Sequence, residues 1–239
     1  MIYPTNALYT MIPKNGCSTL RFSVAVANGV ISSLDQVHWI HSNNGSFPAT
    51  TESAARADYT FVVLRCPYAR LVSAFMDKVV NMDWPSWELW NRTDRATHPH
   101  DVTFADFVRH IARLPISQLN IHWRPQRDFL LFERYDDYFD LARIDTAWPT
   151  ISERAGLRIV DTRAVLGHHT KGREVALSDA SSMPAIDLLI RKRAGEVPTP
   201  ASLFDDETLE LATKRYRDDV QLYDTHFGPS DLARALGAP

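Results

Sequence analysis

The stretch that decides the fold is Met11-Ile-Pro-Lys-Asn-Gly-Cys-Ser-Thr-Leu20. It follows a short apolar run, residues 7–12, that is typical of a β-strand, and it precedes an amphipathic run that is typical of a helix. A strand, a tight turn and a helix N-terminus in this order direct several backbone N–H groups at one point, where Lys14 adds a full charge. The stretch therefore predicts a cradle for an anion, although an ordinary strand-to-helix turn has the same pattern.

A second strand and helix follow the same plan. Residues Tyr59 to Arg65 form a nearly continuous apolar run that ends in arginine, as expected of a central parallel strand covered on both faces. Residues 66–80 are predicted to be helical, with Ser73 a turn or two into that helix. Because ligands in open α/β sheets bind beyond the carboxyl ends of the strands, Arg65 and Ser73 are expected near the Lys14 loop. Two strand-to-helix turns would then hold one elongated anion.

The remaining elements have weaker patterns. A short strand is predicted over residues 37–41 and another over 129–132. Helices are predicted over residues 18–28, 103–114 and 206–227, and residues 138–156 are predicted to contain a further helix that ends at Gly156. The tryptophan-rich residues 81–101, within a possible insertion over 81–115, are interpreted as a lid or substrate-side segment, and aromatic packing under a loop explains them equally well. The whole chain, residues 1–239, is predicted to be a single α/β domain with a mainly parallel sheet.

Composition excludes several classes of protein. A formal net charge of −3 speaks against nucleic-acid binding, and no apolar stretch is long enough to insert into a membrane. The two cysteines, Cys17 and Cys66, are too few for a disulfide framework and lack the spacing of a zinc site. The N-terminal residues lack the pattern of a secretory signal, so a cytoplasmic location is expected. We also expect no bound metal.

Four segments together resemble one known family, the carbohydrate sulfotransferases that include the chondroitin and HNK-1 enzymes. Ile12 to Leu20 resembles their 5′-phosphosulfate loop, and Val63 to Phe75 resembles their 3′-phosphate motif. His122-Trp-Arg-Pro-Gln126 is similar to their His-Trp-x-Pro signature, and residues 214–223 are similar to their C-terminal Tyr-x-x-Asp-Phe helix. Cys66 departs from the family, which usually has an acidic residue there. The resemblance implies a P-loop NTPase-like three-layer fold, with a central sheet flanked by helices.

The resemblance implies transfer of a sulfuryl group from 3′-phosphoadenosine 5′-phosphosulfate (PAPS) to a hydroxyl of a carbohydrate or related acceptor, leaving 3′-phosphoadenosine 5′-phosphate (PAP). In this reaction Lys14 would stabilise the negative charge on the leaving phosphate. Arg65 and Ser73 would clamp the 3′-phosphate. The residues that the resemblance implies for donor binding are Lys14, Asn15, Gly16, Cys17, Ser18, Thr19, Arg65, Ser73 and, on a later loop, Thr170 and Lys171.

The acceptor hydroxyl needs a base, and histidine is the usual choice near neutral pH. His41 is expected at the end of the predicted strand 37–41, and His122 lies in the family signature, so both stay candidates. Two other functions stay open. A P-loop kinase or NTPase is disfavoured because the sequence lacks Gly-x-x-x-x-Gly-Lys-Ser/Thr and an evident aspartate for magnesium. A non-catalytic nucleotide-binding module of the same fold is the other alternative.

Overall fold

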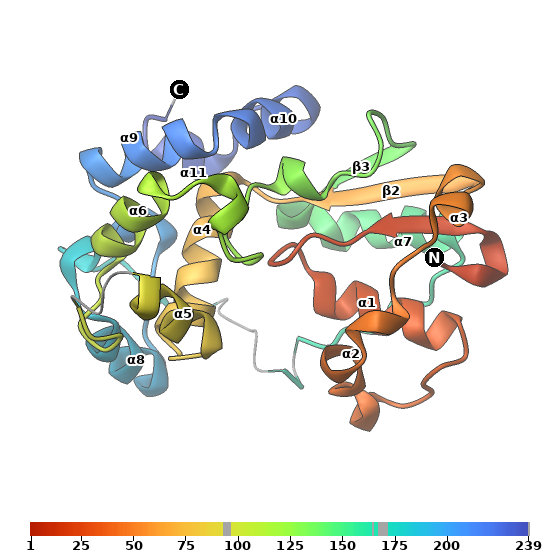
Figure 1. Cartoon of the computed structure of the whole chain (residues 1–239), viewed down its shortest axis with the longest axis horizontal. Coiled ribbons are helices and arrows are strands. Elements are labelled where there is room, and N and C mark those ends of the chain that lie inside the picture. Colours follow the sequence, from red (N-terminus) through yellow and green to blue (C-terminus); the bar gives the residue numbers. More distant parts are fainter. Residues whose placement is uncertain (93–96, 164, 167–171, 239) are drawn as a thin grey trace. The chain divides into compact units, whose positions relative to one another are not determined.

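The computed structural model describes residues 1–92, 97–163, 165–166 and 172–238 (Figure 1). Contacts within the chain group the residues into two compact units. The first unit comprises Met1–Arg65 and Phe129–His169, and the second comprises Cys66–Asp128 and Thr170–Pro239. The sequence predicted one domain over the whole chain, and this stays a prediction.

A parallel three-stranded sheet organises the first unit. Its strands are β1 (Ala7–Thr10), β2 (Tyr59–Leu64) and β3 (Asp137–Asp140), in the order β1-β2-β3. Thr10 pairs with Val62, and Leu64 pairs with Asp140. The carboxyl ends of β1 and β2 therefore lie side by side, as the sequence predicted. The helices of this unit are α1 (Cys17–Ala27), α2 (Trp39–Ser42), α3 (Thr51–Ala55) and α7 (Ile144–Ala155), joined by 3-10 turns at Tyr3–Thr5, Leu34–Gln36, Asn44–Ser46 and Leu141–Arg143.

Side chains from one face of β2 form the centre of the hydrophobic core of the first unit. Tyr59, Phe61 and Val63 share one face of β2 because successive side chains of a strand point to opposite faces. These residues pack with Leu20 of α1 and Ile151 of α7 in one buried cluster. Burial of a side chain such as Phe61, which is fully buried, contributes roughly 1.5–3 kcal/mol. The same packing fixes the start of α1 relative to the ends of the strands.

Aromatic side chains organise the second unit. The Phe75 ring lies 5.2 Å from that of Phe104, and the Phe107 ring lies 5.3 Å from that of Trp123, measured between centroids. The elements of this unit are α4 (Pro67–Ala74), a π-helical turn (Phe75–Val79), α5 (Trp84–Arg92), α6 (Phe104–Arg113), α8 (Ala185–Ala194), α9 (Asp206–Arg215), α10 (Arg217–Phe227) and α11 (Asp231–Ala235), with 3-10 turns at Ile116–Gln118, Gln126–Phe129, Ala180–Ser182 and Pro200–Leu203 and a parallel strand pair, β4 (Glu174–Val175) with β5 (Val197–Pro198).

The strand predicted over residues 37–41 is wrong, because this segment is helical and forms α2. Val37 and Ile40 are both buried against the cluster that contains Phe22 of α1. Two buried residues three positions apart share a face of a helix, whereas they would point to opposite faces of a strand. His41 therefore does not lie at the end of a strand.

Two further predictions need correction. Residues 129–132 do not form a strand, because Phe129 ends a 3-10 turn and the third strand is β3 instead. The side chain of Asp136, just before β3, helps to pair β3 with β2, since its Oδ2 accepts hydrogen bonds from the Thr60 amide and hydroxyl, both at 2.8 Å.

The helix predicted over 206–227 is two helices, α9 and α10, that meet at Tyr216. Tyr216 has a non-helical ψ of 24°, which interrupts the helix.

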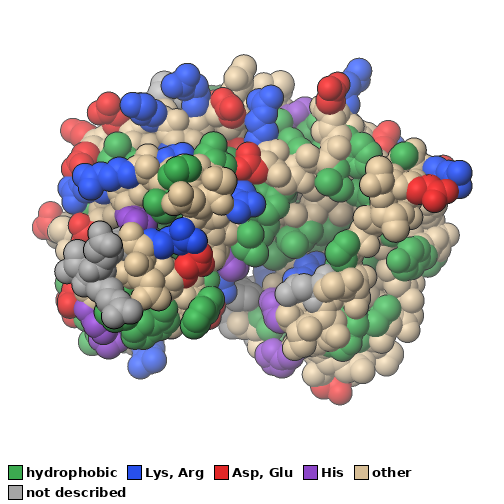
Figure 2. Space-filling view, in the orientation of Figure 1, with side chains coloured by type: hydrophobic (Ala, Val, Ile, Leu, Met, Phe, Trp, Pro, Cys, Tyr) green, Lys and Arg blue, Asp and Glu red, His purple; other side chains and the backbone are tan. Residues whose placement is uncertain are grey.

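On the face shown in Figure 2, acidic and basic side chains are interspersed. Within the described part of the chain, the search for a helix with the length and apolar composition of a membrane span found none.

Candidate functional site

The loop between β1 and α1 has an unusual backbone. Lys14 has φ 71° and Gly16 has φ 73°, so both lie in the left-handed region. The Asn15 amide donates to the Ile12 carbonyl at 3.2 Å and closes a tight turn around Lys14. A lysine in this region is strained by roughly 1–3 kcal/mol, and such strain is concentrated at binding and catalytic sites. Lys14 is therefore held in one conformation at the end of β1.

Two side-chain hydrogen bonds connect this loop to the end of β2. Arg65 Nη1 donates to the Lys14 carbonyl at 3.1 Å. Asn15 Nδ2 donates to the Val63 carbonyl at 2.8 Å, and Asn15 is fully buried. The structure thus brings Lys14 and Arg65 together, as the sequence predicted. Asn15 thus supports the loop twice, through its side-chain amide to β2 and through its backbone N–H, which closes the turn around Lys14.

The N-terminus of α1 completes the cradle. Gly16 is the N-cap of this helix. No side chain makes a capping hydrogen bond there, and the first turn contains no acidic residue. The first amides of a helix have no partner within the helix, and they favour anions. The turn that carries Cys17 and Ser18 therefore offers N–H groups beside the charges of Lys14 and Arg65.

Thr19 has a structural partner. Its hydroxyl lies 3.1 Å from the hydroxyl of Thr162, and the Thr162 amide donates to it at 3.4 Å. Both threonines are buried. The Thr19 side chain therefore fixes α1 to the segment around Thr162, and we assign it no direct donor contact. The predicted donor residues Thr170 and Lys171 lie outside the described residues.

His41 is exposed on α2 in the first unit. This short helix is held by Arg21 of α1, a residue that the sequence reasoning missed. Arg21 Nη2 donates to the carbonyl of Ile40, and its guanidinium lies 4.4 Å from the centre of the Phe47 ring. Burial lowers the pKa of Arg21 from its ordinary value. In the sequence, the signal for this role is an arginine that stands between Leu20 and Phe22 in an otherwise apolar helix.

The other predicted residues belong to the second unit. Ser73 lies on α4 and is half-buried. His122 lies in an irregular segment, residues 120–127, which we call the His122 segment. Lys14 and Arg65, by contrast, belong to the first unit. The prediction that Ser73 joins Arg65 in one clamp stays a prediction.

Side chains from α4, from α10 and from the junction of α9 and α10 hold the backbone of the His122 segment. Asp219 of α10 accepts from the amide of Gln126 at 2.7 Å and from the amide of Arg127 at 2.9 Å. The Tyr216 hydroxyl, at the junction of α9 and α10, donates to the Trp123 carbonyl at 2.6 Å. From α4, Arg70 Nη1 donates to the Arg124 carbonyl at 2.7 Å. The Tyr-x-x-Asp motif thus has a physical role, which is to bind the His-Trp-x-Pro motif.

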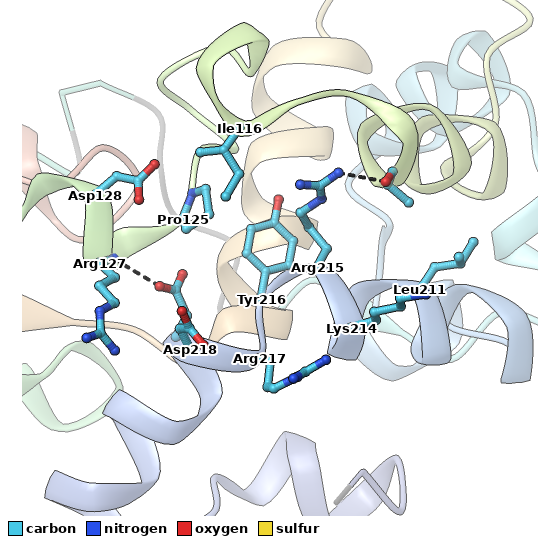
Figure 3. Close-up of a pocket in the computed structure, with 12 residues that line it drawn as sticks. Ile116, Pro125, Arg127, Asp128, Leu211, Lys214, Arg215, Tyr216, Arg217 and Asp218 are labelled. Atoms are coloured by element: carbon cyan, nitrogen blue, oxygen red, sulfur yellow. Dashed lines mark hydrogen bonds between the residues drawn. The ribbon is translucent and has the colours of Figure 1, made fainter.

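A cavity of about 430 Å³ lies beside this segment (Figure 3). Figure 3 shows Tyr216 rising from the junction of α9 and α10 toward the stretch that carries Pro125. Arg215 closes another side, where its Nη2 donates to the carbonyls of Ala112 and Leu114, both at 2.6 Å. Asp219 is buried at the cavity wall, and this burial raises the pKa of its carboxyl group. The two amide donors and the Arg70 guanidinium oppose that rise.

His122 has its own partners. His122 Nδ1 lies 2.7 Å from Asn120 Oδ1, which also accepts from the His122 amide at 3.1 Å. Asn120 Nδ2 donates to Glu88 Oε2 at 2.7 Å. Sequence reasoning missed Glu88 and Asn120. No pattern in the sequence connects them, because 32 positions separate the two residues.

The tryptophan-rich segment forms helix α5. Trp87 and Trp90 pack edge to face at 5.6 Å between ring centroids, and His98 contacts both rings. Aromatic packing therefore accounts for these two tryptophans. Trp84 differs because it is 75% exposed. The interpretation of this segment as a lid or substrate-side element stays a prediction. Within the part of the chain that the structure describes, no group of three potential metal ligands was found.

Comparison with known proteins gives one consistent result. The sequence profile of a family described as "Sulfotransferase family" matches residues 4–226. Human carbohydrate sulfotransferase 10 is 31% identical over 145 residues, which cover 48% of this chain and 40% of that protein. Carbohydrate sulfotransferase 14 of Danio rerio is 27% identical over 134 residues, which cover 49% of this chain and 36% of that protein. The match thus spans less than half the length of these relatives. No solved structure matches the chain significantly.

Proposed function

Because the chain belongs to the sulfotransferase family, we propose that it transfers a sulfuryl group from PAPS to a hydroxyl of a carbohydrate or related acceptor. The carbohydrate acceptor is suggested by the names of the relatives, which are carbohydrate sulfotransferases. The parallel order β1-β2-β3, with a loop and helix after β1, supports a P-loop NTPase-like arrangement of the donor site.

The observation that carries the proposal is the hydrogen bond between Arg65 and the Lys14 carbonyl. It connects residues that follow the adjacent ends of β1 and β2, next to the N-terminus of α1, and this supports a site with two positive charges. A donor with phosphate groups at both its 5′ and 3′ positions needs such a pair of charges. We assign the 5′-phosphosulfate to Lys14 and the α1 amides, and the 3′-phosphate to Arg65, whose guanidinium suits phosphate oxygens.

The reaction follows from this assignment. The acceptor oxygen attacks sulfur, the bond between sulfur and the bridging oxygen of the donor breaks, and PAP leaves with that electron pair. Negative charge therefore grows on the leaving phosphate, where Lys14 and the α1 amides stabilise it. A histidine takes the proton of the acceptor hydroxyl. His41 and His122 are the candidates, and the proposal invokes no metal ion.

Ligand binding tests the donor assignment. Titration calorimetry with PAP, with adenosine 5′-phosphosulfate and with magnesium-ATP should show the tightest binding for PAP, without a requirement for magnesium. Arg65→Ala should weaken PAP binding by roughly 10- to 100-fold, because a charge-assisted hydrogen bond contributes about 1.5–3 kcal/mol. It should leave the affinity for adenosine 5′-phosphosulfate, which lacks the 3′-phosphate, nearly unchanged.

A matched control is Arg56→Ala, which removes an exposed arginine of the same unit. The side chain of Arg56 is 76% exposed and forms a surface ion pair with Glu52. This variant should bind PAP like the unaltered protein. Preference for magnesium-ATP would instead support a kinase or NTPase. Equal PAP affinity for Arg65→Ala and the unaltered protein would refute the assignment of the 3′-phosphate to Arg65.

A further inference from the structure

Three side chains of the second unit form a hydrogen-bonded chain that ends at a histidine ring. Glu88 of α5 accepts from Asn120 Nδ2 at 2.7 Å. Asn120 Oδ1 lies 2.7 Å from His122 Nδ1. All three residues are partly buried. The members of this chain thus come from one helix and from the irregular segment opposite it.

The chemistry of the three groups fixes the direction of each hydrogen bond. A carboxylate can only accept hydrogen bonds, so the NH₂ group of Asn120, and not its oxygen, must face Glu88. The amide oxygen of Asn120 must then face the ring, and an amide oxygen also only accepts. His122 Nδ1 therefore carries a hydrogen. In a neutral imidazole with hydrogen on Nδ1, the basic lone pair lies on Nε2.

Contacts on both sides keep the chain in this arrangement. Glu88 also pairs with Arg92, one helical turn later, at 3.2 Å. Asn120 Oδ1 also accepts from the backbone amide of His122, which fixes the amide group relative to the ring. The backbone that follows His122 is held by Tyr216, through its bond to the Trp123 carbonyl. The orientation of the ring is thus set by the fold before any substrate binds.

We propose that Glu88 and Asn120 are positioning residues that hold His122 in the Nδ1–H tautomer, so that Nε2 is the atom that takes the proton of the acceptor hydroxyl. This inference rests on the proposed function, in which His122 is one of the two candidate bases. As the new oxygen–sulfur bond forms, the hydroxyl proton moves to Nε2 and PAP leaves. The resulting imidazolium keeps its Nδ1–H bond to Asn120 and later returns the proton to water.

Nitrogen NMR tests the tautomer directly. The full chain is labelled with ¹⁵N-histidine, and two-bond proton–nitrogen correlations are recorded at alkaline pH, where imidazole is neutral. The unaltered protein should show His122 with a protonated Nδ1 and an unprotonated Nε2. In Asn120→Ala this preference should be lost. The histidine signals that disappear in the variant His122→Gln are assigned to His122.

A reciprocal exchange separates positioning from general damage. Asn120→Asp alone places two carboxylates together and should disturb the chain. In the double variant Glu88→Gln with Asn120→Asp, the glutamine amide donates to the new carboxylate, which again accepts from Nδ1, so the Nδ1–H tautomer should return. The internal control is His110 of α6, which is half-buried in the same unit and should keep its signals throughout.

Transfer assays give the second readout. With ³⁵S-labelled PAPS and a set of 4-nitrophenyl glycosides as acceptors, His122→Ala should lower kcat by at least about 100-fold, as expected for loss of a general base. Asn120→Ala should lower kcat by roughly 10- to 100-fold. Neither variant should change the Kd for PAP. The double variant should recover most of the loss.

Two results would overturn the inference. One is an Nε2-protonated His122 in the unaltered protein, or a tautomer that Asn120→Ala leaves unchanged. The other is a loss of transfer in His41→Ala that His122→Ala does not share. Because the NMR measurement needs no donor, these results are distinguishable from a failure of the proposed function, which would appear as absent PAP binding.

Discussion

The Lys14 loop and the His122 segment carry the two halves of the proposed chemistry, and the fold supports them in opposite ways. The Lys14 loop lies between a strand and a helix that are adjacent in sequence, and its conformation is largely set by the backbone turn at Lys14 and Gly16. The His122 segment has no regular structure apart from turns. Its shape is imposed by side chains that are distant in sequence, including Arg70 of α4 and Asp219 of α10.

This difference predicts that substitutions at the two sites will affect activity and stability differently. The conformation at Lys14 is set by its own backbone turn, so removal of the Lys14 side chain should change activity without changing the shape of the loop. A segment that is held by buried side chains elsewhere should lose shape and stability when one of those side chains is removed. The following predictions use this contrast.

The largest effect is expected for Lys14→Ala. Removing the charge at the leaving phosphate should lower the rate of sulfate transfer from PAPS by roughly 10²- to 10³-fold, similar to the loss of one transition-state donor in other enzymes. The midpoint of denaturant unfolding should change little. Arg56→Ala, an exposed site in the same unit, is the control for both measurements. Undiminished transfer by Lys14→Ala would rule out the proposed role of the lysine.

Asp219→Ala should have the largest effect on stability. It leaves the amides of Gln126 and Arg127 without their acceptor in a buried site, so the free energy of unfolding should fall by about 2–4 kcal/mol. Urea unfolding measures this change. The neighbouring Asp218 is exposed, and Asp218→Ala should change stability by less than about 0.5 kcal/mol. Equal losses in the two variants would contradict the assigned role of Asp219.

Tyr216→Phe tests a single hydrogen bond to the same segment. The ring stays, while the bond from the hydroxyl to the Trp123 carbonyl is lost in a buried place. We expect a loss of about 1 kcal/mol in the free energy of unfolding, which is typical of one such bond. Tyr3→Phe removes a hydroxyl from a side chain that is 68% exposed and should have no measurable effect. The assignment fails if the two substitutions give the same unfolding curve.

The smallest effect is expected on the pH dependence of stability, through His110. Burial, followed by the charges of Arg113 and Arg92, lowers the pKa of His110 below its ordinary value of 6.5. Near that value the unfolded chain therefore binds more protons than the folded chain, so the contribution of His110 to stability falls as the pH falls through 6.5. His110→Gln should reduce the pH dependence of unfolding in this range. The exposed His100→Gln is the control, and an identical slope in both would refute the prediction.

The sequence predicted the Lys14 site because its information is local. Periodicity located β1, α1 and β2, and the rule for parallel strands placed Arg65 beside the loop, which the bond to Lys14 confirms. Local pattern was insufficient for residues 37–41, where the alternation of apolar and polar side chains fits a strand and a helix equally. Packing of Val37 and Ile40 against α1 decided the matter, and it moved His41 into a helix.

The amino-acid sequence by itself determined the family, the parallel strands and the charges of the donor cradle, because these depend on residues that are neighbours along the chain. Only the tertiary structure decided what Glu88, Asn120 and Asp219 do. Their partners are distant in sequence, as for Asp219 and Gln126, which are 93 positions apart. Such hydrogen bonds have no periodicity to reveal them, since they exist only after packing has removed water and brought the helices together.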